Sequence, residues 1–326
     1  MDRNEISQIF AGKILNGEWH WLEYHFAPYK NGYEHFLCAS IVDSCASVEE
    51  KLPGYADAFS SKLASLSGRE KYLPHYEQII QLLAELYVIR HLISVPFDNP
   101  KFVYEPTTGD SGKNPELGIQ LPDKNIYIEV KCREFVEHNN NRGNAAVEVP
   151  SRMGGVLELV KTVVDKDESV VLPRDNAVKD FLLSADEKFA PFKNINSDAV
   201  TVLVIVWDDF VYEPISALLN EASGLLTGKS FYTENGGPVA FSNINAILVT
   251  RHSHQLVRAT KDEFPVDGIK DPLDWGAEGN VLPKAYIPVN SSGELDKYLC
   301  DLLQARHIDE LQNAADYRPQ QFVLRI

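Results

Sequence analysis

"PELGIQLPDKNIYIEVKCRE", residues 115–134, is the stretch that decides the fold. Two apolar runs, 116–121 and 126–133, flank the turn-forming letters "PDKN", which is the pattern of a β-hairpin. In the register that this turn favours, three apolar pairs share one side of the hairpin: Leu121 with Ile126, Ile119 with Ile128, and Leu117 with Val130. Because side chains alternate between the faces of a strand, this pattern fixes which residues point the other way.

The other side of the hairpin carries charge. In the same register Glu116 faces Lys131, and Gly118 faces Glu129 and leaves space between the two carboxylates. Opposed Cβ atoms lie about 4.5–5.5 Å apart, so these charged groups are expected to converge on one patch. A hard divalent cation relieves the repulsion of two carboxylates, and a neighbouring lysine can orient a water, which suits hydrolysis of a phosphodiester. The alternative is a plain Glu116–Lys131 ion pair on a solvated sheet face, which contributes about 0–1 kcal/mol.

Residues 70–93 predict the strongest helix of the chain, because apolar residues wrap most of its circumference. Glu85 lies inside this wrap, and Gln81 stands one turn before it. A buried carboxylate is costly unless it is paired or binds a metal. Two interpretations stay open: Glu85 is a buried functional acid, or it shares one polar stripe of the helix with Gln81.

The rest of the chain predicts more strands and helices around the hairpin. Residues 199–209, "AVTVLVIVWDD", are a near-continuous apolar run, typical of a central strand buried on both faces. Further strands are predicted at 101–106, 244–252 and 284–290, and helices at 177–189, 213–226 and 294–315. This order predicts an α/β fold with a mixed central β-sheet flanked by helices. Because no Pro/Gly/Ser-rich linker divides the chain, we expect one domain at 70–326 and an N-terminal extension at 1–69 packed on it.

At the hairpin the sequence resembles the PD-(D/E)XK nuclease superfamily, whose core is the restriction-endonuclease-like fold. The resemblance rests on Pro115-Glu116 in one strand and Glu129-Val130-Lys131 in the next, with 13 residues (129 − 116) from acid to acid. A helix before the hairpin and a buried strand after it also match, so the resemblance covers roughly residues 70–255. The sequence departs from the commoner pattern by having Glu116 where Asp is usual.

The resemblance implies a metal-dependent endonuclease that hydrolyses phosphodiester bonds of DNA rather than RNA. It implies that Glu116 and Glu129 bind Mg²⁺, for which Mn²⁺ can substitute, that Glu85 is a third acid, and that Lys131 positions or activates the attacking water. Asp110, in the Gly-rich loop before the hairpin, stays open as a competitor of Glu116 for the metal. Roles in defence against foreign DNA, restriction or repair are analogies at the level of the fold. The alternative is a non-catalytic module on the same fold that binds nucleic acid or protein.

The charge of the chain limits how it can bind nucleic acid. Its 31 Lys and Arg against 47 Asp and Glu give a net charge of −16, which counts against a protein that coats nucleic acid through its overall charge. Local contacts remain open, and three arginines are candidate phosphate contacts or, alternatively, ordinary solvated charges: Arg133, Arg142 and Arg152. An acidic surface also fits a protein partner that delivers the substrate, or a homodimer.

The sequence further predicts a cytoplasmic protein. It has no run of about 18 apolar residues that predicts a membrane span, and its start lacks a signal-peptide core. The four cysteines form no CxxC pair, which indicates reduced thiols. His252 and His254 lie near a strand end without a third zinc ligand nearby, so we expect them to have a role in a loop.

Overall fold

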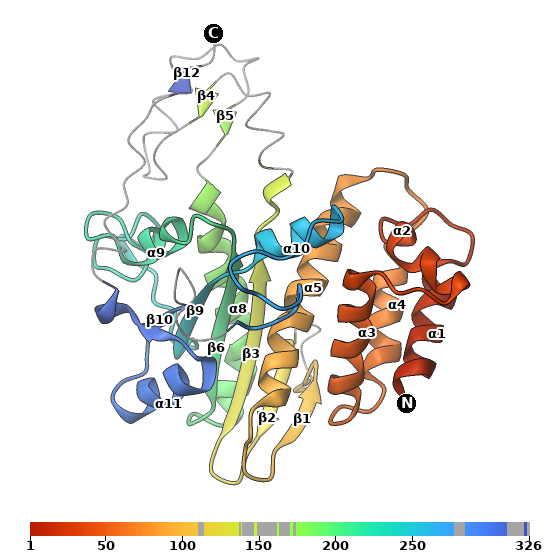
Figure 1. Ribbon diagram of the computed structural model, residues 1–326. Helices are drawn as coiled ribbons and strands as arrows, with labels where there is room; N and C mark the ends of the chain where they lie inside the picture. The colour runs from red at the N-terminus through yellow and green to blue at the C-terminus, as the bar shows by residue number, and fades with distance from the viewer. Residues whose placement is uncertain are drawn as a thin grey trace.

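A mixed β-sheet forms the centre of the molecule (Figure 1). The structure is a computed structural model that describes residues 1–109, 114–136, 174–276 and 284–311, with His138, Thr162 and the two-residue strands at 147–148, 170–171 and 323–324. In this part of the chain the sheet has seven strands, in the order β1-β2-β3-β6-β9-β10-β11. Helices cover both of its faces, so the predicted α/β fold with a mixed central sheet is confirmed.

The strands at the centre of the sheet run parallel, and those toward its edges do not all follow them. The sheet consists of β1 (Lys101–Tyr104), β2 (Leu117–Gln120), β3 (Asn125–Cys132), β6 (Val200–Trp207), β9 (Ala246–Arg251), β10 (Ala285–Pro288) and β11 (Arg306–His307). Strands β3, β6 and β9 are parallel, whereas β2 is antiparallel to β1 and β3, and β10 is antiparallel to β9. All 8 residues of β6 are buried, which is the environment that its apolar run predicts.

Short strands form two small additional sheets. Strands β4 (Val147–Glu148), β5 (Val170–Val171) and β12 (Val323–Leu324) pair in one, and β7 (Thr233–Glu234) and β8 (Gly237–Pro238) form a two-residue hairpin in the other. None of them pairs with the central sheet.

The alternating side chains of the sheet pack against different helices on its two faces. On one face lie α5 (Leu73–Ser94), α10 (Ser253–Thr260) and α11 (Glu294–Leu303), which share a hydrophobic cluster with Val202 and Val204 of β6. On the other face α8 (Ala177–Ile195) and α9 (Tyr212–Leu219) pack against Leu203 and Ile205, with the 3₁₀ turn η2 (Arg174–Asn176) before α8. Successive side chains of β6 therefore pack alternately into two hydrophobic cores, one on each face of the sheet.

The first 69 residues form a helical layer on the outer side of α5 (Figure 1). This layer contains α1 (Arg3–Ile14), α2 (Glu23–Phe26), the 3₁₀ helix η1 (Ala27–Asn31), α3 (Phe36–Glu49) and α4 (Tyr55–Ala64). Its apolar residues belong to the same hydrophobic cluster as α5, and Lys51 Nζ donates to the carbonyl of Ile93 at 2.7 Å. Among the described residues, no helix has the length and apolar character needed to cross a membrane.

The hairpin register differs from the predicted one by two residues. Leu117 pairs with Ile128 and Ile119 with Ile126, and the loop closes with Leu121 N–H donating to the carbonyl of Lys124 at 2.9 Å. The prediction of a turn centred between Asp123 and Lys124 was therefore wrong. The loop is centred one residue earlier, so Leu121 belongs to the loop and not to the ladder. A shift of two residues keeps every side chain on its predicted face, since the side-chain period is two.

The predicted helix at 294–315 was too long. Helix α11 ends at Leu303, because Gln304 adopts a left-handed conformation with φ 49°. The chain then forms β11, which pairs in parallel with β10, and the 3₁₀ turn η3 (Ile308–Glu310). Pairing with the sheet thus overrides the helical periodicity after residue 303.

Candidate active site

A cavity opens beside β3 where its neighbour β2 has not yet begun. Strand β3 continues to Cys132, whereas β2 starts at Leu117, opposite Ile128, so the last residues of β3 extend past β2. The cavity has a volume of about 220 Å³. It is lined by Gln81 and Glu85 of α5, Glu116, residues 130–132 of β3, and Asp180, Phe181 and Ser184 of α8. Side chains from both faces of the sheet can therefore meet at this position.

Glu116 lies at an irregularity of the backbone. Its N–H donates to the carbonyl of Ile128 at 2.9 Å, although Ile128 is already the partner of Leu117. Two residues of one strand thus oppose one residue of the other, which is the arrangement of a β-bulge, and bulges redirect side chains. The Glu116 side chain lines the cavity and is only 11% exposed.

Glu129 is the central acid of the site. It is fully buried and forms ion pairs with two lysines. Lys131 Nζ lies 2.8 Å from its Oε1, and Lys188 Nζ lies 2.7 Å from Oε1 and 2.9 Å from Oε2. Lys188 Nζ is also 3.4 Å from Oε1 of Glu116. The two carboxylates therefore lie on one side of the hairpin, as predicted. The predicted pairing of Lys131 with Glu116 was wrong, because the two-residue shift moves Lys131 away from the position opposite Glu116. Its ion pair among the described residues is with Glu129, two positions away on the same face of β3.

Gly118 has a different neighbour from the predicted one. It pairs with Tyr127 and not with Glu129, and a Cβ at this position would lie 3.2 Å from Pro106 Cγ and 3.4 Å from Tyr127 Cε1. Gly118 therefore makes room for a proline and an aromatic ring, and not for an ion between the carboxylates.

Lys188 is the residue of the site that the sequence prediction missed. Helix α8 turns Val178, Leu182 and Phe189 into the core, and its polar residues at positions 180, 184 and 188 recur every four residues along one stripe. The stripe was visible in the sequence. Which strand it faces is decided by the packing of α8, which the spacing alone does not give.

Helix α5 presents a matching polar stripe from the other face of the sheet. Gln81 and Glu85 both line the cavity, and Glu77 Oε1 accepts a hydrogen bond from the backbone N–H of Val136 at 2.7 Å. The interpretation of Glu85 as part of a polar stripe with Gln81 is thus the observed one. This stripe is also what brings Glu85 to the acidic cluster.

Burial and mutual repulsion shift the pKa values of the clustered acids. Burial, together with the charge of Glu116, raises the pKa of Glu85 from 4.5 to about 8, against the opposing effect of Lys62. Burial and the charge of Glu129 raise the pKa of Glu116 from 4.5 to about 7, although Lys188 counteracts them. The cluster therefore holds less positive charge than its three carboxylates require.

The donor set suits a hard divalent cation, but the side chains are not arranged around one. Carboxylate oxygens are the ligands that Mg²⁺ prefers in proteins, and raised pKa values are typical of acids that need a cation. Within the described residues, however, no group of three or more His, Cys, Asp or Glu side chains is gathered closely enough to hold a metal. The ammonium group of Lys188 lies between Glu116 and Glu129, in the place that a shared cation needs.

The other predicted site residues are only partly described. Arg133 is half-buried beyond Lys131, burial lowers its pKa, and its Nε has no hydrogen-bond partner within the described residues. Asp110, Arg142 and Arg152 lie outside the described residues. Their predicted roles remain predictions.

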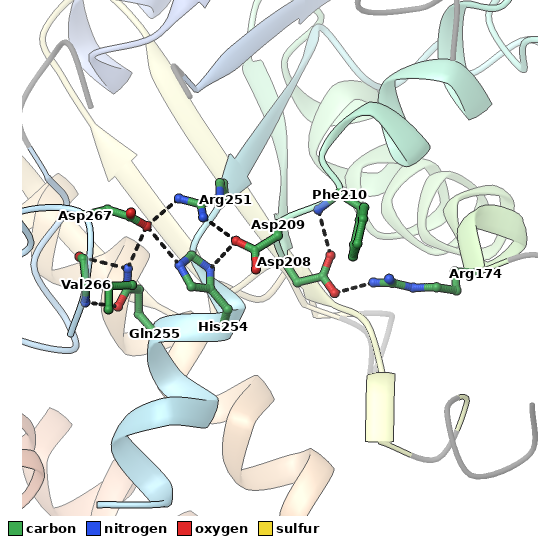
Figure 2. A network of polar contacts seen from close by, with 9 residues as sticks. All are labelled: Arg174, Asp208, Asp209, Phe210, Arg251, His254, Gln255, Val266 and Asp267. Atoms are coloured by element: carbon green, nitrogen blue, oxygen red, sulfur yellow. Dashed lines mark hydrogen bonds and ion pairs between the residues drawn. The ribbon is translucent and has the colours of Figure 1, made fainter. Parts of the chain in front are cut away.

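A second polar cluster lies where β6 and β9 end (Figure 2). Arg251 bonds to Asp209 and, at 2.5 Å, to Asp267 Oδ2. His254 lies between the same two carboxylates, with Nε2 3.4 Å from Asp267 Oδ2 and Nδ1 3.8 Å from Asp209 Oδ1. Since each acid already faces the Arg251 guanidinium, this cluster is a closed ion-pair network.

The two histidines have structural environments. His252 stacks on Tyr87 with ring centroids 3.7 Å apart, and its Nε2 is 2.8 Å from the carbonyl of Pro272. His254 belongs to α10 and to the ion-pair network, so it lies in a helix and not in the predicted loop.

Comparisons of the chain with family models, with curated proteins and with solved structures give no match.

Proposed function

We propose that the chain is a metal-dependent nuclease that hydrolyses phosphodiester bonds, in DNA rather than RNA, in the manner of the PD-(D/E)XK superfamily. The observation that supports this proposal is the convergence of Glu85, Glu116 and Lys131 at one cavity, with the fully buried Glu129 in contact with Lys131. These groups come from a bulge, a strand and a helix. They meet at the open edge of a hairpin beside a parallel strand pair, as in the fold that the sequence resembles.

Each group has a role that follows from its position. Glu116, Glu129 and Glu85 would hold Mg²⁺, with Mn²⁺ as a substitute. When bound, such an ion polarises the phosphate and lowers the pKa of a coordinated water. Lys131, fixed by its 2.8 Å contact to Glu129, orients the attacking water or stabilises the charge that develops on the phosphate. The water oxygen bonds to phosphorus as one ester bond breaks, and no covalent enzyme intermediate forms.

The acidic chain restricts how the substrate binds. With a net charge of −16, attraction cannot come from the whole surface, so we propose that a few local cations contact the phosphates. Arg133, next along the face of Lys131 with a buried, unpartnered Nε, suits such a contact. A protein partner or a second copy of the chain would supply further contacts. Because all four cysteines are free thiols, we place the activity in the cytoplasm.

A cleavage assay tests the proposal. Supercoiled plasmid, linear DNA and a matched RNA are incubated with the purified chain in Mg²⁺, in Mn²⁺ and in EDTA. Glu129→Gln and Lys131→Met are assayed beside the wild type, with Lys193→Met as the matched control and circular dichroism to check folding. We expect cleavage that needs the metal and is reduced at least about 100-fold in both site variants. Cleavage in EDTA, or equal rates in folded site variants, would contradict the nuclease assignment.

One observation favours a second candidate function. Lys188 and Lys131 already neutralise much of the acidic cluster, which is what a non-catalytic binding module on the same fold would have. Such a module binds nucleic acid or protein without cutting. A gel-shift experiment on the same proteins distinguishes the two functions. Binding of DNA in Mg²⁺ without cleavage, at an affinity that Lys131→Met does not change, supports the module.

A further inference from the structure

Lys188 contacts both acids that the proposed function assigns to the metal. Its Nζ donates to both oxygens of Glu129 at 2.7 and 2.9 Å, and to Oε1 of Glu116 at 3.4 Å. Its side chain is only 16% exposed, and Glu129 is not exposed at all. Lys188 is therefore an internal cation, and not a surface lysine that reaches a nearby acid.

A shared metal ion and Lys188 cannot occupy this position together. A cation that bridges Glu116 and Glu129 needs the space between their carboxylates, which the Lys188 ammonium group now fills. Glu129 keeps Lys131 as a second partner at 2.8 Å, so it is not left alone when Lys188 moves away. Metal binding is thus a competition with one specific side chain.

The charge balance of the described cluster favours an exchange of cations. Glu85, Glu116 and Glu129, if ionised, carry one more charge than Lys131 and Lys188 supply. A divalent cation would reverse this to one net positive charge, which a single phosphodiester neutralises. The nearby Lys62 and Glu105 pair with each other and leave this balance unchanged.

The structure lets Lys188 move without moving its helix. Helix α8 is fixed by Val178, Leu182, Ala185 and Phe189, all of which are buried in the core. The side chain of lysine has four rotatable bonds, and the cavity of about 220 Å³ reaches Ser184, one turn before Lys188 on α8. Rotation about these bonds moves the ammonium group away from the carboxylates while the helix stays in place.

We propose that Lys188 holds the place of the metal ion in the metal-free protein, and that metal binding releases it to contact the scissile phosphate. The inference rests on the proposed function, since it concerns the same acids. It assigns two opposite effects to one side chain: Lys188 competes with the metal and assists the reaction. A residue with a merely structural role would do neither.

Metal binding without nucleic acid tests the first effect. Mn²⁺ chloride is titrated into the full-length wild type, Lys188→Met and Lys188→Gln, with calorimetry as the readout. Lys193→Met, on the same helix but bonded only to the carbonyl of Ser197 at 3.4 Å among the described contacts, is the control. We expect both Lys188 variants to bind Mn²⁺ on the order of tenfold more tightly than wild type, the effect of removing one charge-assisted hydrogen bond. The control is expected to match wild type.

The outcomes separate the inference from the proposed function. Equal or weaker Mn²⁺ binding by the Lys188 variants, beside a wild type that binds Mn²⁺ and cuts DNA, overturns the inference and leaves the nuclease intact. Absence of Mn²⁺ binding in every protein, with no cleavage, overturns both.

Single-turnover cleavage at saturating Mn²⁺ tests the second effect. We expect Lys188→Met to cut on the order of 10–100-fold more slowly, although it binds the metal more tightly. Lys188→Arg should recover part of the rate, because a guanidinium also binds phosphate. A wild-type rate in folded Lys188→Met would overturn the assignment of the phosphate contact.

Discussion

Lys188 Nζ lies 2.7 Å from Oε1 and 2.9 Å from Oε2 of Glu129, so that one ion pair joins α8 to the fully buried acid of β3. The two residues are 59 positions apart in the sequence, so no local sequence pattern predicts their contact. It makes Glu129 a structural residue as well as a candidate ligand.

Replacing Glu129 should therefore destabilise the metal-free protein. In Glu129→Gln, Lys131 and Lys188 lose a buried charged partner, although Lys188 keeps Glu116. We expect a loss of about 3 kcal/mol in the free energy of unfolding, at the lower end for breaking a buried ion pair. Urea denaturation followed by circular dichroism measures it.

The control for this prediction is an exposed pair of similar length. Lys13 and Asp57 lie 2.7 Å apart, and the Asp57 side chain is 62% exposed. Asp57→Asn should cost less than about 1 kcal/mol. Equal losses in the two variants would show that the burial of Glu129 adds nothing.

The stability of the metal-free protein should fall as the pH rises. Burial and neighbouring acids raise the pKa of Glu85 to about 8 and of Glu116 to about 7, from 4.5. Between these values the folded state holds protons that the unfolded state has released, so each unit of pH lowers the free energy of unfolding. At about 1.4 kcal/mol per pKa unit, these two groups give an expected loss of roughly 6 kcal/mol from pH 5 to 8.5, measured in denaturant titrations.

The variant Glu85→Gln identifies the source of that slope. It keeps the size of the side chain and removes the group with the highest pKa of the acidic cluster. The variant should be more stable than wild type at pH 8.5 and should show a flatter pH dependence. A slope that is unchanged in Glu85→Gln assigns the effect to other groups.

Mn²⁺ should stabilise the protein more at high pH than at low pH. Metal binding requires ionised carboxylates, and Glu116 with a pKa of about 7 is largely protonated at pH 5.5. The melting temperature in Mn²⁺ relative to EDTA is expected to rise by several degrees at pH 8 and by little at pH 5.5. Glu116→Gln should reduce the difference without abolishing it, because Glu85 still titrates over this range. A shift of equal size at both pH values in the wild type would contradict the carboxylate site.

The sequence predicted the faces of the hairpin better than its register. Apolar alternation fixed Leu117, Ile119 and Ile128 on one side, and a slip of one residue would have exposed them all. A slip of two residues preserves that pattern, and only the closure of the loop at Leu121 decides between the two registers. For the same reason the shared face of Glu129 and Lys131 was predicted correctly, but their partners were not. The bulge at Glu116 and the contact of Lys188 with Glu129 depend on tertiary packing, which no local sequence pattern encodes.

Gly118→Ala should separate the predicted role of this glycine from the observed one. An added Cβ would lie 3.2 Å from Pro106 Cγ and 3.4 Å from Tyr127 Cε1, so the variant overpacks the strand. We expect a loss of about 1–2 kcal/mol in the free energy of unfolding. The affinity for Mn²⁺ in calorimetry should stay within a factor of about two, because Gly118 is not opposite Glu129. A large loss of Mn²⁺ affinity in a folded variant would restore the predicted role.

The network at the ends of β6 and β9 should respond to the loss of its arginine through His254. Burial lowers the pKa of His254, and the charge of Arg251 lowers it further, while Asp209 and Asp267 act in the opposite direction. In Arg251→Met the two acids would face His254 alone, so the pKa of His254 should rise (Figure 2). A raised folded-state pKa gives a contribution to stability that is present at low pH and is lost as the pH rises through that pKa. The variant should therefore be destabilised less at pH 5.5 than at pH 8, and NMR titration of the His254 ring protons measures the shift directly. An unchanged titration of His254, in a variant destabilised equally at both pH values, would show that the arginine acts through packing and not through its charge.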